Sequence, residues 1–220
     1  MSIYERKLRL TIRTAATFSS GQGAPGLVDR EVEHDANGFP YVRGRTLKGL
    51  LAESAESLVF ALALQDQPQW RDVKDTLFGR PGRGMAEQGT LGIGDAQLPQ
   101  ALRAQLLKAR DADPVQFSAA SVLESLTAIR RQTAMNPEGG PLRGTLRSMR
   151  VLLPYVTLEA PLHFRMTPND QQLAFLAAAV LDWRRGGTGR NRGRGCLSAV
   201  IDDEATTKGL YDSFAKEIAP

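Results

Sequence analysis

Arginine and glycine alternate within one short window of the chain, RRGGTGRNRGRG (Arg184–Gly195). Glycine lets backbone amides approach a phosphate chain closely, and arginine neutralises the phosphate charge. The window lacks the Gly-Lys-Ser/Thr ending of a nucleoside-triphosphate loop, and it follows a predicted helix, whose C-terminal end disfavours anions. The pattern therefore favours a nucleic-acid backbone, with a solvated flexible loop as the alternative. The candidate ligands of RNA in this window are Gly187, Gly189, Arg190, Arg192, Gly193 and Arg194.

Basic residues gather at two other places, and arginine predominates over lysine in both. The first group is Arg130, Arg131, Arg143, Arg147 and Arg150, of which the first four are candidate RNA ligands. The second is Arg43, Arg45 and Lys48, at the start of a predicted helix, where free amides and the helix dipole favour a phosphate. A guanidinium binds phosphate through two hydrogen bonds and stacks on bases, so this bias fits nucleic acid. Because the net charge is only +4, ordinary solvated surface charge is the alternative.

Carboxylates are dense in one predicted loop, LVDREVEHDANG (Leu27–Gly38). Asp29 and Asp35 are candidate ligands of Mg²⁺ or another hard divalent cation, which would keep several waters. Their spacing matches no calcium-binding loop, and an acidic surface loop is the alternative. His34, between them, is a candidate general base.

Several classes of protein are excluded by what the chain lacks. The one cysteine, Cys196, excludes an internal disulfide and a multi-cysteine zinc site, and it falls in a strand predicted to be buried. A ribonuclease with two catalytic histidines would need His34 and His163 in one pocket, yet His163 alternates with core residues of a predicted strand. No run approaches the roughly 20 apolar residues of a membrane span. The start, MSIYERKLRL, has no signal-peptide core, so we expect a cytoplasmic protein without a membrane partner.

The apolar pattern predicts the elements that position these groups. Alternation of Leu8, Leu10 and Ile12 with charged residues predicts a strand over residues 6–14. A helix is expected from Leu47 to about Leu64, capped by Thr46. The expected elements up to residue 150 also include a long loop at about 19–45, a turn at Leu77–Gly84, a strand at Thr90–Gly94, a surface helix at Leu98–Arg110 and a projecting hairpin made of a strand at Thr127–Thr133 and a turn at Gly139–Pro141.

The remaining residues predict a second strand–helix–strand unit. Alternation over Val156–Met166 predicts a long strand, and Thr167-Pro168 is expected to open a buried helix with the body Leu173–Trp183. A last strand, Cys196–Ile201, and a polar helix follow. Without its insertions, the order strand–helix–strand–strand–helix–strand is that of an α+β ferredoxin-like or RRM-like core with long loop insertions. The aromatic base-stacking motif of RRM domains is absent, so a generic RRM factor is disfavoured.

Three stretches in this order resemble the RAMP superfamily of CRISPR-associated proteins. GFPYVRGRTLKGLL (Gly38–Leu51) looks like the family's PY-x-PG-S-SLKG segment, with arginine at 43 and 45 where proline and serine are commoner. LFGRPGRGMAEQGTLGIGDAQL (Leu77–Leu98) looks like its LFG-to-DA-x-L strand, and GGTGRNRGRGCLSAVI (Gly186–Ile201) like its glycine-rich loop and last strand. The resemblance covers about residues 8–202.

Within the superfamily, the chain is most similar to the backbone subunit of type III effector complexes. Val28-Asp29 occupies the place of a Val-Asp pair whose aspartate cleaves target RNA with a divalent metal, although Arg30-Glu31 follow where Asn-Pro is usual. Thr127–Arg147 resembles the thumb-like hairpin that distorts the guide–target duplex. The resemblance implies a metal-dependent endoribonuclease in which Asp29, through Mg²⁺, positions RNA so that a 2′-hydroxyl attacks the adjacent phosphate. His34 as general base is the alternative.

The resemblance also implies the partners: CRISPR RNA, single-stranded target RNA, further copies of the chain or related RAMP subunits, and other effector subunits. Two other functions stay open, a non-catalytic RNA-binding subunit of the same complex and, less favoured, an endoribonuclease that processes CRISPR RNA. We expect a single RAMP domain over residues 1–220, with its core at about 5–202. Insertions are expected at about 19–45, 98–125 and 127–150, and a C-terminal helix at about 203–220.

Overall fold

A four-stranded antiparallel sheet forms the centre of the molecule in the computed structural model, which describes all residues except 1–3, 20, 22, 25–26, 81–87 and 220. The strands lie in the order β2-β5-β1-β6, and their bounds are β1 Tyr4–Ile12, β2 Leu91–Ile93, β5 Thr157–Phe164 and β6 Leu197–Ile201. Numbered as the four core strands, this order is 2-3-1-4, as two strand–helix–strand units joined by a hairpin require. The predicted ferredoxin-like core is therefore confirmed.

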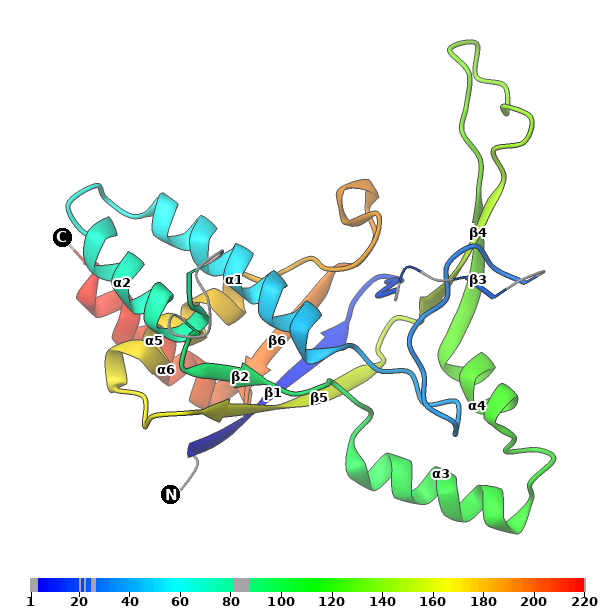
Figure 1. The fold of residues 1–220 in the computed structure, drawn as a ribbon, viewed down its shortest axis with the longest axis horizontal. Helices are drawn as coiled ribbons and strands as arrows, with labels where there is room; N and C mark the ends of the chain where they lie inside the picture. Colours follow the sequence, from blue (N-terminus) through cyan, green and yellow to red (C-terminus); the bar gives the residue numbers. More distant parts are fainter. Residues whose placement is uncertain (1–3, 20, 22, 25–26, 81–87, 220) are drawn as a thin grey trace.

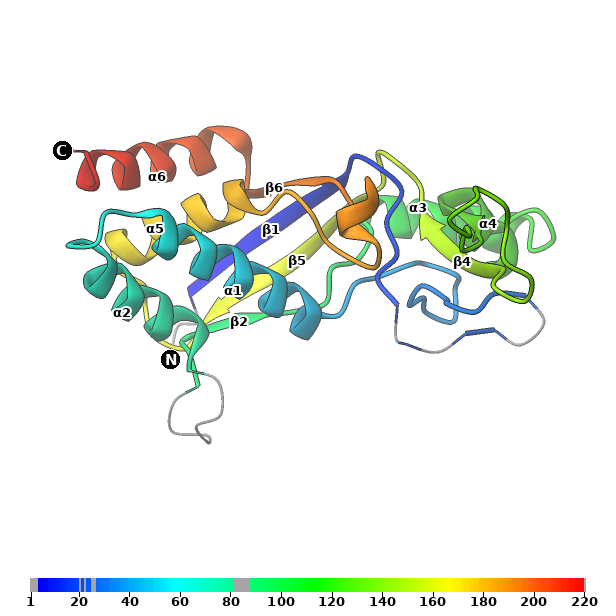
Figure 2. The same ribbon diagram turned by 90° about the horizontal axis from the view of Figure 1, so that it is seen from above.

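Helices cover one face of this sheet, because every second residue of its strands is apolar. Leu8, Leu10 and Ile12 of β1 are fully buried beneath helices α1 (Gly44–Ala61) and α5 (Asp170–Asp182), whereas Lys7 and Arg9 are exposed on the opposite face. Helices α2 (Gln67–Phe78) and α6 (Glu204–Glu217) pack beside α5 (Figures 1 and 2). Helix α5 is buried continuously from Leu173 to Val180 because it lies at the centre of this layer.

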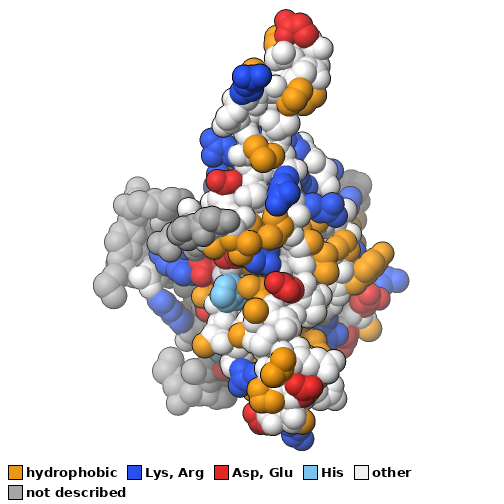
Figure 3. Space-filling view, turned by 90° about the vertical axis from the view of Figure 1, so that its right-hand side faces the viewer, with side chains coloured by type: hydrophobic (Ala, Val, Ile, Leu, Met, Phe, Trp, Pro, Cys, Tyr) orange, Lys and Arg blue, Asp and Glu red, His pale blue; other side chains and the backbone are white. Residues whose placement is uncertain are grey.

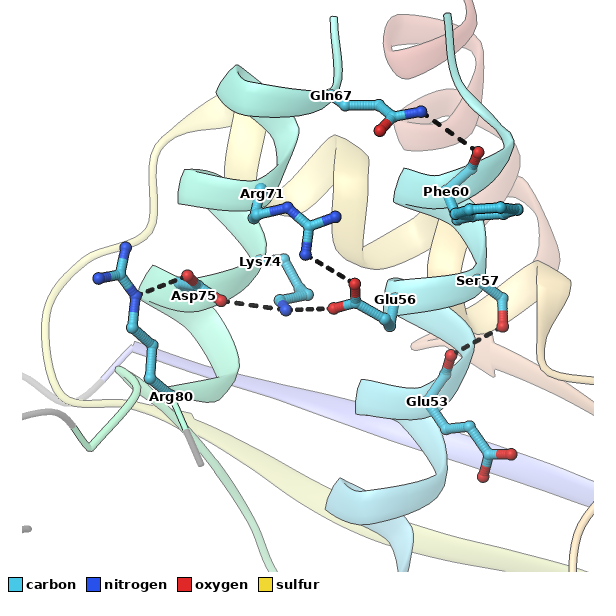
Figure 4. A network of polar contacts seen from close by, with 9 residues as sticks. All are labelled: Glu53, Glu56, Ser57, Phe60, Gln67, Arg71, Lys74, Asp75 and Arg80. Carbon is cyan, nitrogen blue, oxygen red and sulfur yellow. Dashed lines mark hydrogen bonds and ion pairs between the residues drawn. The ribbon is translucent and has the colours of Figure 1, made fainter. Parts of the chain in front are cut away.

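Helix α2 has no counterpart among the elements predicted from sequence. Its buried residues Trp70, Val73 and Leu77 follow a helical spacing, and the Trp70 ring stacks on Phe175 with centroids 5.6 Å apart. On its outer side, the Glu56 carboxylate of α1 binds both Arg71 and Lys74 (Figure 4). The helix therefore has one apolar face and one ion-paired face. The polar residues between the apolar ones make this helical spacing hard to recognise in the sequence.

A second group of elements lies at one end of the sheet. It consists of the hairpin β3 (Thr127–Gln132) and β4 (Arg147–Leu152), helices α3 (Gln100–Ala112) and α4 (Ala119–Leu126), and the long irregular segment between β1 and α1. The hairpin projects from the body (Figure 1), with Ile129 opposite Arg150 and Gln132 opposite Arg147. The projecting hairpin, the surface helix and the long first loop agree with the sequence prediction, whereas α4 was not predicted.

Two predicted helix starts are wrong. Helix α1 begins at Gly44 rather than after Thr46, and its first amide donates to the Asp95 carboxylate at 2.8 Å, a cap from a distant residue. Helix α5 begins at Asp170, because Asn169 and Gln172 form a reciprocal capping box that the Thr167-Pro168 signal does not supply. Part of the turn predicted at Leu77–Gly84 lies outside the described residues. Among the described residues, no helix is long and apolar enough to cross a membrane.

Candidate nucleic-acid interface

A cavity of about 660 Å³ lies where three distant segments of the chain meet. The acidic loop supplies Asp29 and Arg30, and the β3–β4 hairpin supplies the end of β3, at Gln132, and the start of β4. The Arg/Gly loop, residues 184–195, closes the cavity from the other side. The residues of the hairpin and the Arg/Gly loop that line the cavity are Gln132, Arg147, Ser148, Met149, Gly187, Thr188, Gly189, Arg190, Asn191, Arg192 and Arg194.

Asp29 is held at the edge of this cavity by Ser148 of β4. The Asp29 carboxylate Oδ2 accepts hydrogen bonds from the Ser148 amide at 2.6 Å and from the Ser148 hydroxyl at 3.2 Å. The Asp29 amide donates in turn to the Ser148 carbonyl at 2.9 Å. The backbone hydrogen bond from Ser148 is the main cause that lowers the pKa of Asp29, and the nearby charge of Arg147 lowers this pKa further. Asp29 is therefore a carboxylate at neutral pH, suited to bind a cation rather than to take up a proton.

The residues after Asp29 clamp the acidic loop onto the hairpin. Glu31 pairs with the Arg150 guanidinium at 2.7 Å, and Arg150 also donates to the Thr127 hydroxyl at 3.2 Å. Arg150 is only 6% exposed, so the structure makes it a structural cation rather than a member of the basic surface group. Arg30 bridges to the Arg/Gly loop by donating to the Thr188 hydroxyl at 3.1 Å.

The Arg/Gly loop is held by backbone hydrogen bonds to the segment that follows β1 and by turns within the loop. The single turn η2 (Arg190–Arg192) lies between Gly189 and Gly193, which both adopt left-handed backbone angles. The Thr188 amide donates to Thr17, and the Gly195 amide donates to Ala15. A Cβ atom at Gly195 would lie 1.9 Å from the Gly186 carbonyl oxygen, so glycine is required there for packing. The amides of Thr188 and Gly195 are therefore engaged within the fold.

The basic residues of this interface differ in how they are engaged. Arg190 is held by Glu53 of α1 through two hydrogen bonds of 2.8 and 2.6 Å. Figure 4 shows the Glu53 carboxylate turned away from the Glu56 cluster. Arg194 contacts the Met149 sulfur at 2.9 Å. By contrast, Arg147 and Arg192 are exposed and form no ion pair with the described part of the chain.

The other hairpin arginines lie outside the cavity. Arg130, Arg131 and Arg143 are exposed, and basic side chains are spaced along the projecting hairpin (Figure 3). Met135, Leu142 and Leu146 are also exposed there. The hairpin therefore extends the basic surface away from the body of the molecule.

The structure places the predicted helix-start group elsewhere. Arg43 pairs with Glu33 at 2.7 Å, and the Lys48 ammonium donates to the Leu91 carbonyl at 2.7 Å. Burial lowers the pKa of Lys48. The first helical amide is bound by Asp95, whose negative charge opposes a phosphate at this site. Neither these two residues nor Arg45, which is exposed, line the cavity with Asp29.

Asp35 and His34 line a separate cavity of about 250 Å³, together with Phe39, Tyr41 and Arg103. Both oxygens of Asp35 are engaged, one by the amides of its own turn and the other by Arg103 at 3.1 Å. In the part of the chain that the structure describes, no group of three or more His, Cys, Asp or Glu residues is placed to hold a metal ion. The two aspartates are thus not brought together, and a metal site made of protein ligands alone does not fit.

A magnesium ion shared with a substrate does fit the first cavity. Mg²⁺ in proteins is often bound by one or two carboxylates together with waters and substrate phosphates. Asp29 offers one ionised carboxylate beside Arg147 and Arg192, which suit phosphate oxygens.

Sequence reasoning missed five residues with polar or charged side chains that line the cavity: Arg30, Gln132, Ser148, Thr188 and Asn191. A serine or glutamine in a strand carries no pattern of its own, so only the pairing of distant segments reveals these residues. Cys196 is half-buried just before β6 rather than buried within it. His163 faces away from the core and pairs with Glu5 at 3.1 Å, as its alternation with core residues predicted.

Comparison with known proteins gives one family match and several similar solved structures. The family model described as the RAMP superfamily matches residues 9–198. A chain from a cryo-EM structure of the Type III-B Cmr-beta bound to cognate target RNA superposes with a TM-score of 0.64 at 11% identity, over 94% of this chain and 98% of the other. A chain from the apo state of Type III-B Cmr-beta gives 0.61 at 12% identity, over 91% and 98%. These structures share the fold, and no curated protein matches the sequence.

Proposed function

The chain belongs to the RAMP superfamily, and from this premise we propose that it is an RNA-binding backbone subunit of a type III CRISPR effector complex. In this proposal the subunit cleaves target RNA, and Asp29 is its catalytic residue. The observation that carries the proposal is the cavity in which Asp29, the β3–β4 hairpin and the Arg/Gly loop meet. An ionised carboxylate beside two exposed arginines that form no ion pair with the described residues suits a phosphodiester chain. The fold is shared with a chain from a complex bound to target RNA. The same resemblance supplies the partners: CRISPR RNA, target RNA, and neighbouring effector subunits.

In this proposal, some residues of the cavity bind RNA phosphates and others orient Asp29. Arg147 and Arg192 neutralise successive phosphates, and Arg194 approaches from the Arg/Gly loop. Ser148 holds the Asp29 carboxylate in one orientation, so the carboxylate needs no reorganisation when RNA enters. The exposed hairpin holds the RNA on one side of Asp29, and the Arg/Gly loop holds it on the other.

In the proposed cleavage step, a ribose 2′-oxygen forms a bond to the adjacent phosphorus while the bond to the 5′-oxygen breaks. The 2′-hydroxyl loses its proton to solvent, and the leaving oxygen gains one from solvent. Asp29 would hold Mg²⁺, which supplies charge stabilisation at the phosphate when bound. Arg147 and Arg192 stabilise the charge that develops on the phosphate oxygens. His34 lies in the other cavity, which disfavours it as the base.

The test is cleavage of target RNA by the assembled guide complex, with Mg²⁺ or with EDTA. Asp29→Ala is compared with Asp35→Ala, a matched control in the same loop whose carboxylate lines the other cavity. We expect metal-dependent cutting that is lost in Asp29→Ala and kept in Asp35→Ala, with RNA binding intact in both. Equal cutting by the wild type and Asp29→Ala would refute catalysis by Asp29.

A second candidate function, a non-catalytic RNA-binding subunit of the same complex, is favoured by one observation. Asp29 is the single carboxylate among the described residues that line the cavity, so a metal would depend on the substrate for its other ligands. Tight RNA binding without cutting by the wild type would establish this function. The processing endoribonuclease is the weaker alternative, because the histidines lie outside the cavity.

A further inference from the structure

Tyr155 occupies a backbone position that normally requires glycine. It lies at the third position of the turn Leu153–Val156, with Pro154 before it and a φ of 69°. The Val156 amide closes the turn by donating to the Leu153 carbonyl at 3.4 Å. Proline followed by a positive φ is the signature of a type II turn, whose third position favours glycine or asparagine. A tyrosine there carries backbone strain, because its Cβ crowds the following carbonyl.

The fold itself imposes this backbone angle. The Tyr155 amide donates to the Ile12 carbonyl at 2.7 Å, and the Ile12 amide donates to the Val156 carbonyl at 3.0 Å. Both sides of the turn are thus pinned to the end of β1. The strain cannot relax without breaking the pairing that joins β1 to β5.

Nothing in the described part of the chain compensates for the strain through the side chain. Tyr155 is 77% exposed, and its ring and hydroxyl form no hydrogen bond or ring contact with the described residues. Asp202, the other described non-glycine residue with a positive φ, differs in this respect. Its carboxylate binds the Arg6 guanidinium and the Lys7 amide at 2.7 and 2.8 Å. The backbone of Tyr155 is therefore strained, while its exposed side chain makes no hydrogen bond or ring contact with the described residues.

Tyr155 lies next to the end of β1, and the residue that follows this end, Arg13, connects β1 to the end of the Arg/Gly loop. Arg13 follows Ile12 directly, is exposed, and forms no ion pair with the described residues. Its amide donates at 2.8 Å to Cys196, the first residue after the loop, and its guanidinium donates to Ser198 at 3.0 Å. The turn that carries the exposed ring and an arginine with no ion pair among the described residues are therefore adjacent in the backbone. Together they offer a stacking surface and a phosphate ligand, as in single-strand binding sites.

We propose that Tyr155 is a stacking platform for an unpaired base of single-stranded RNA, with Arg13 binding the phosphate next to that base. This inference deepens the proposed function and rests on it. It adds a contact at the end of β1 and β5, outside the cavity that contains Asp29. The strained backbone is retained because it presents the ring to a ligand instead of to the core.

The experiment measures binding of a labelled, unstructured single-stranded RNA to the full chain by fluorescence anisotropy. Tyr155→Phe keeps both the ring and the strain, whereas Tyr155→Asn tolerates the left-handed angle without a ring, and Tyr155→Gly removes the strain entirely. We expect Tyr155→Phe to bind like the wild type and Tyr155→Asn and Tyr155→Gly to bind roughly 5- to 150-fold more weakly. The melting temperature of Tyr155→Gly should rise above that of the wild type, so weaker binding cannot be attributed to unfolding.

A crosslinking measurement locates the base directly. RNA that contains 5-iodouridine should crosslink at residue 155 in the wild type and in Tyr155→Phe, but not in Tyr155→Asn. If the wild type binds RNA while Tyr155→Asn and Tyr155→Gly bind it equally well, the stacking platform is refuted and the proposed function stands. If the wild type binds no RNA, the proposed function and this inference both fail. A change in oligomeric mass with unaltered RNA affinity would assign Tyr155 to a protein contact and overturn the inference.

Discussion

Asp29 and Ser148 donate hydrogen bonds to each other, one to the carboxylate of Asp29 and one to the backbone carbonyl of Ser148. Ser148 donates its amide to Asp29 Oδ2 at 2.6 Å, and the Asp29 amide donates to the Ser148 carbonyl at 2.9 Å. This reciprocal pair connects the first loop to β4 across more than 100 residues of sequence. It fixes the proposed catalytic carboxylate to the paired strands of the hairpin rather than leaving it on a free loop.

Protonation of Asp29 should occur at a lower pH than for an ordinary aspartate. The hydrogen bonds from Ser148 favour the charged form, so the pKa of Asp29 is depressed below that of an ordinary aspartate. Any stability that this group contributes is present above the unfolded-state pKa and lost as the pH falls through the folded-state pKa. NMR titration of the side-chain carboxyl carbon should show this depressed pKa. Ser148→Ala should raise the pKa only partly, since the backbone bond persists, and an unperturbed pKa in the wild type would contradict the geometry.

Removal of Arg150 should destabilise the fold, although Arg150 looks like a surface cation in the sequence. Arg150→Met leaves the partly buried Glu31 without its ion-pair partner, which costs at most the roughly 3–5 kcal/mol of a fully buried pair. Arg131→Met, on the exposed part of the same hairpin, is the matched control and should change the free energy of unfolding by less than about 0.5 kcal/mol. Urea denaturation measures both. Adding Glu31→Leu to Arg150→Met should recover part of the loss, because no unpaired charge then remains.

RNA binding should depend more on Arg192 than on Arg190. Arg192 forms no ion pair with the described residues, whereas Arg190 is already held by Glu53. Arg192→Ala should weaken binding to unrelated RNA sequences alike and reduce the magnitude of the slope of log affinity against log salt by roughly 0.7–1. Arg190→Ala should have the smaller effect on the slope. Equal slopes for the wild type and Arg192→Ala would remove Arg192 from the phosphate contacts.

Two glycines of the Arg/Gly loop should respond differently to alanine. Gly193 and Gly195 both have positive φ, but a Cβ atom meets nothing within 4 Å at Gly193 and lies 1.9 Å from the Gly186 oxygen at Gly195. Gly193→Ala should therefore cost only the left-handed backbone penalty of about 1–2 kcal/mol. Gly195→Ala should cost more, because the backbone around Gly186 must move. Thermal unfolding of the two variants measures the difference, and equal destabilisation would mean that the loop relaxes freely.

Local patterns predicted the core and missed two helices. Alternating residues such as Leu8 and Leu10 indicate β1 because a strand between helices and solvent shows its two faces in the sequence. The stripe of Trp70, Val73 and Leu77 in α2 is spread among polar residues that bind α1 and the adjoining turn. Helix α4 is only eight residues long and begins at Ser118, so its periodic signal is short. The start of α1 was misplaced because its cap comes from a distant residue, Asp95, whereas the start of α5 is set by a local capping box, Asn169 with Gln172, that the sequence prediction overlooked.

The sequence by itself determined the order of the core strands and helices, the position of the Arg/Gly loop and the place of Asp29 in the first long loop, because these follow from periodicity, glycine content and motif order. Only the tertiary structure decided which charges are available to a ligand. Arg147 and Arg150 are three residues apart on β4, yet one is exposed at the cavity and the other is buried against Glu31. The reason is physical: the availability of a charge depends on its partners, and those partners lie on segments that only folding brings together.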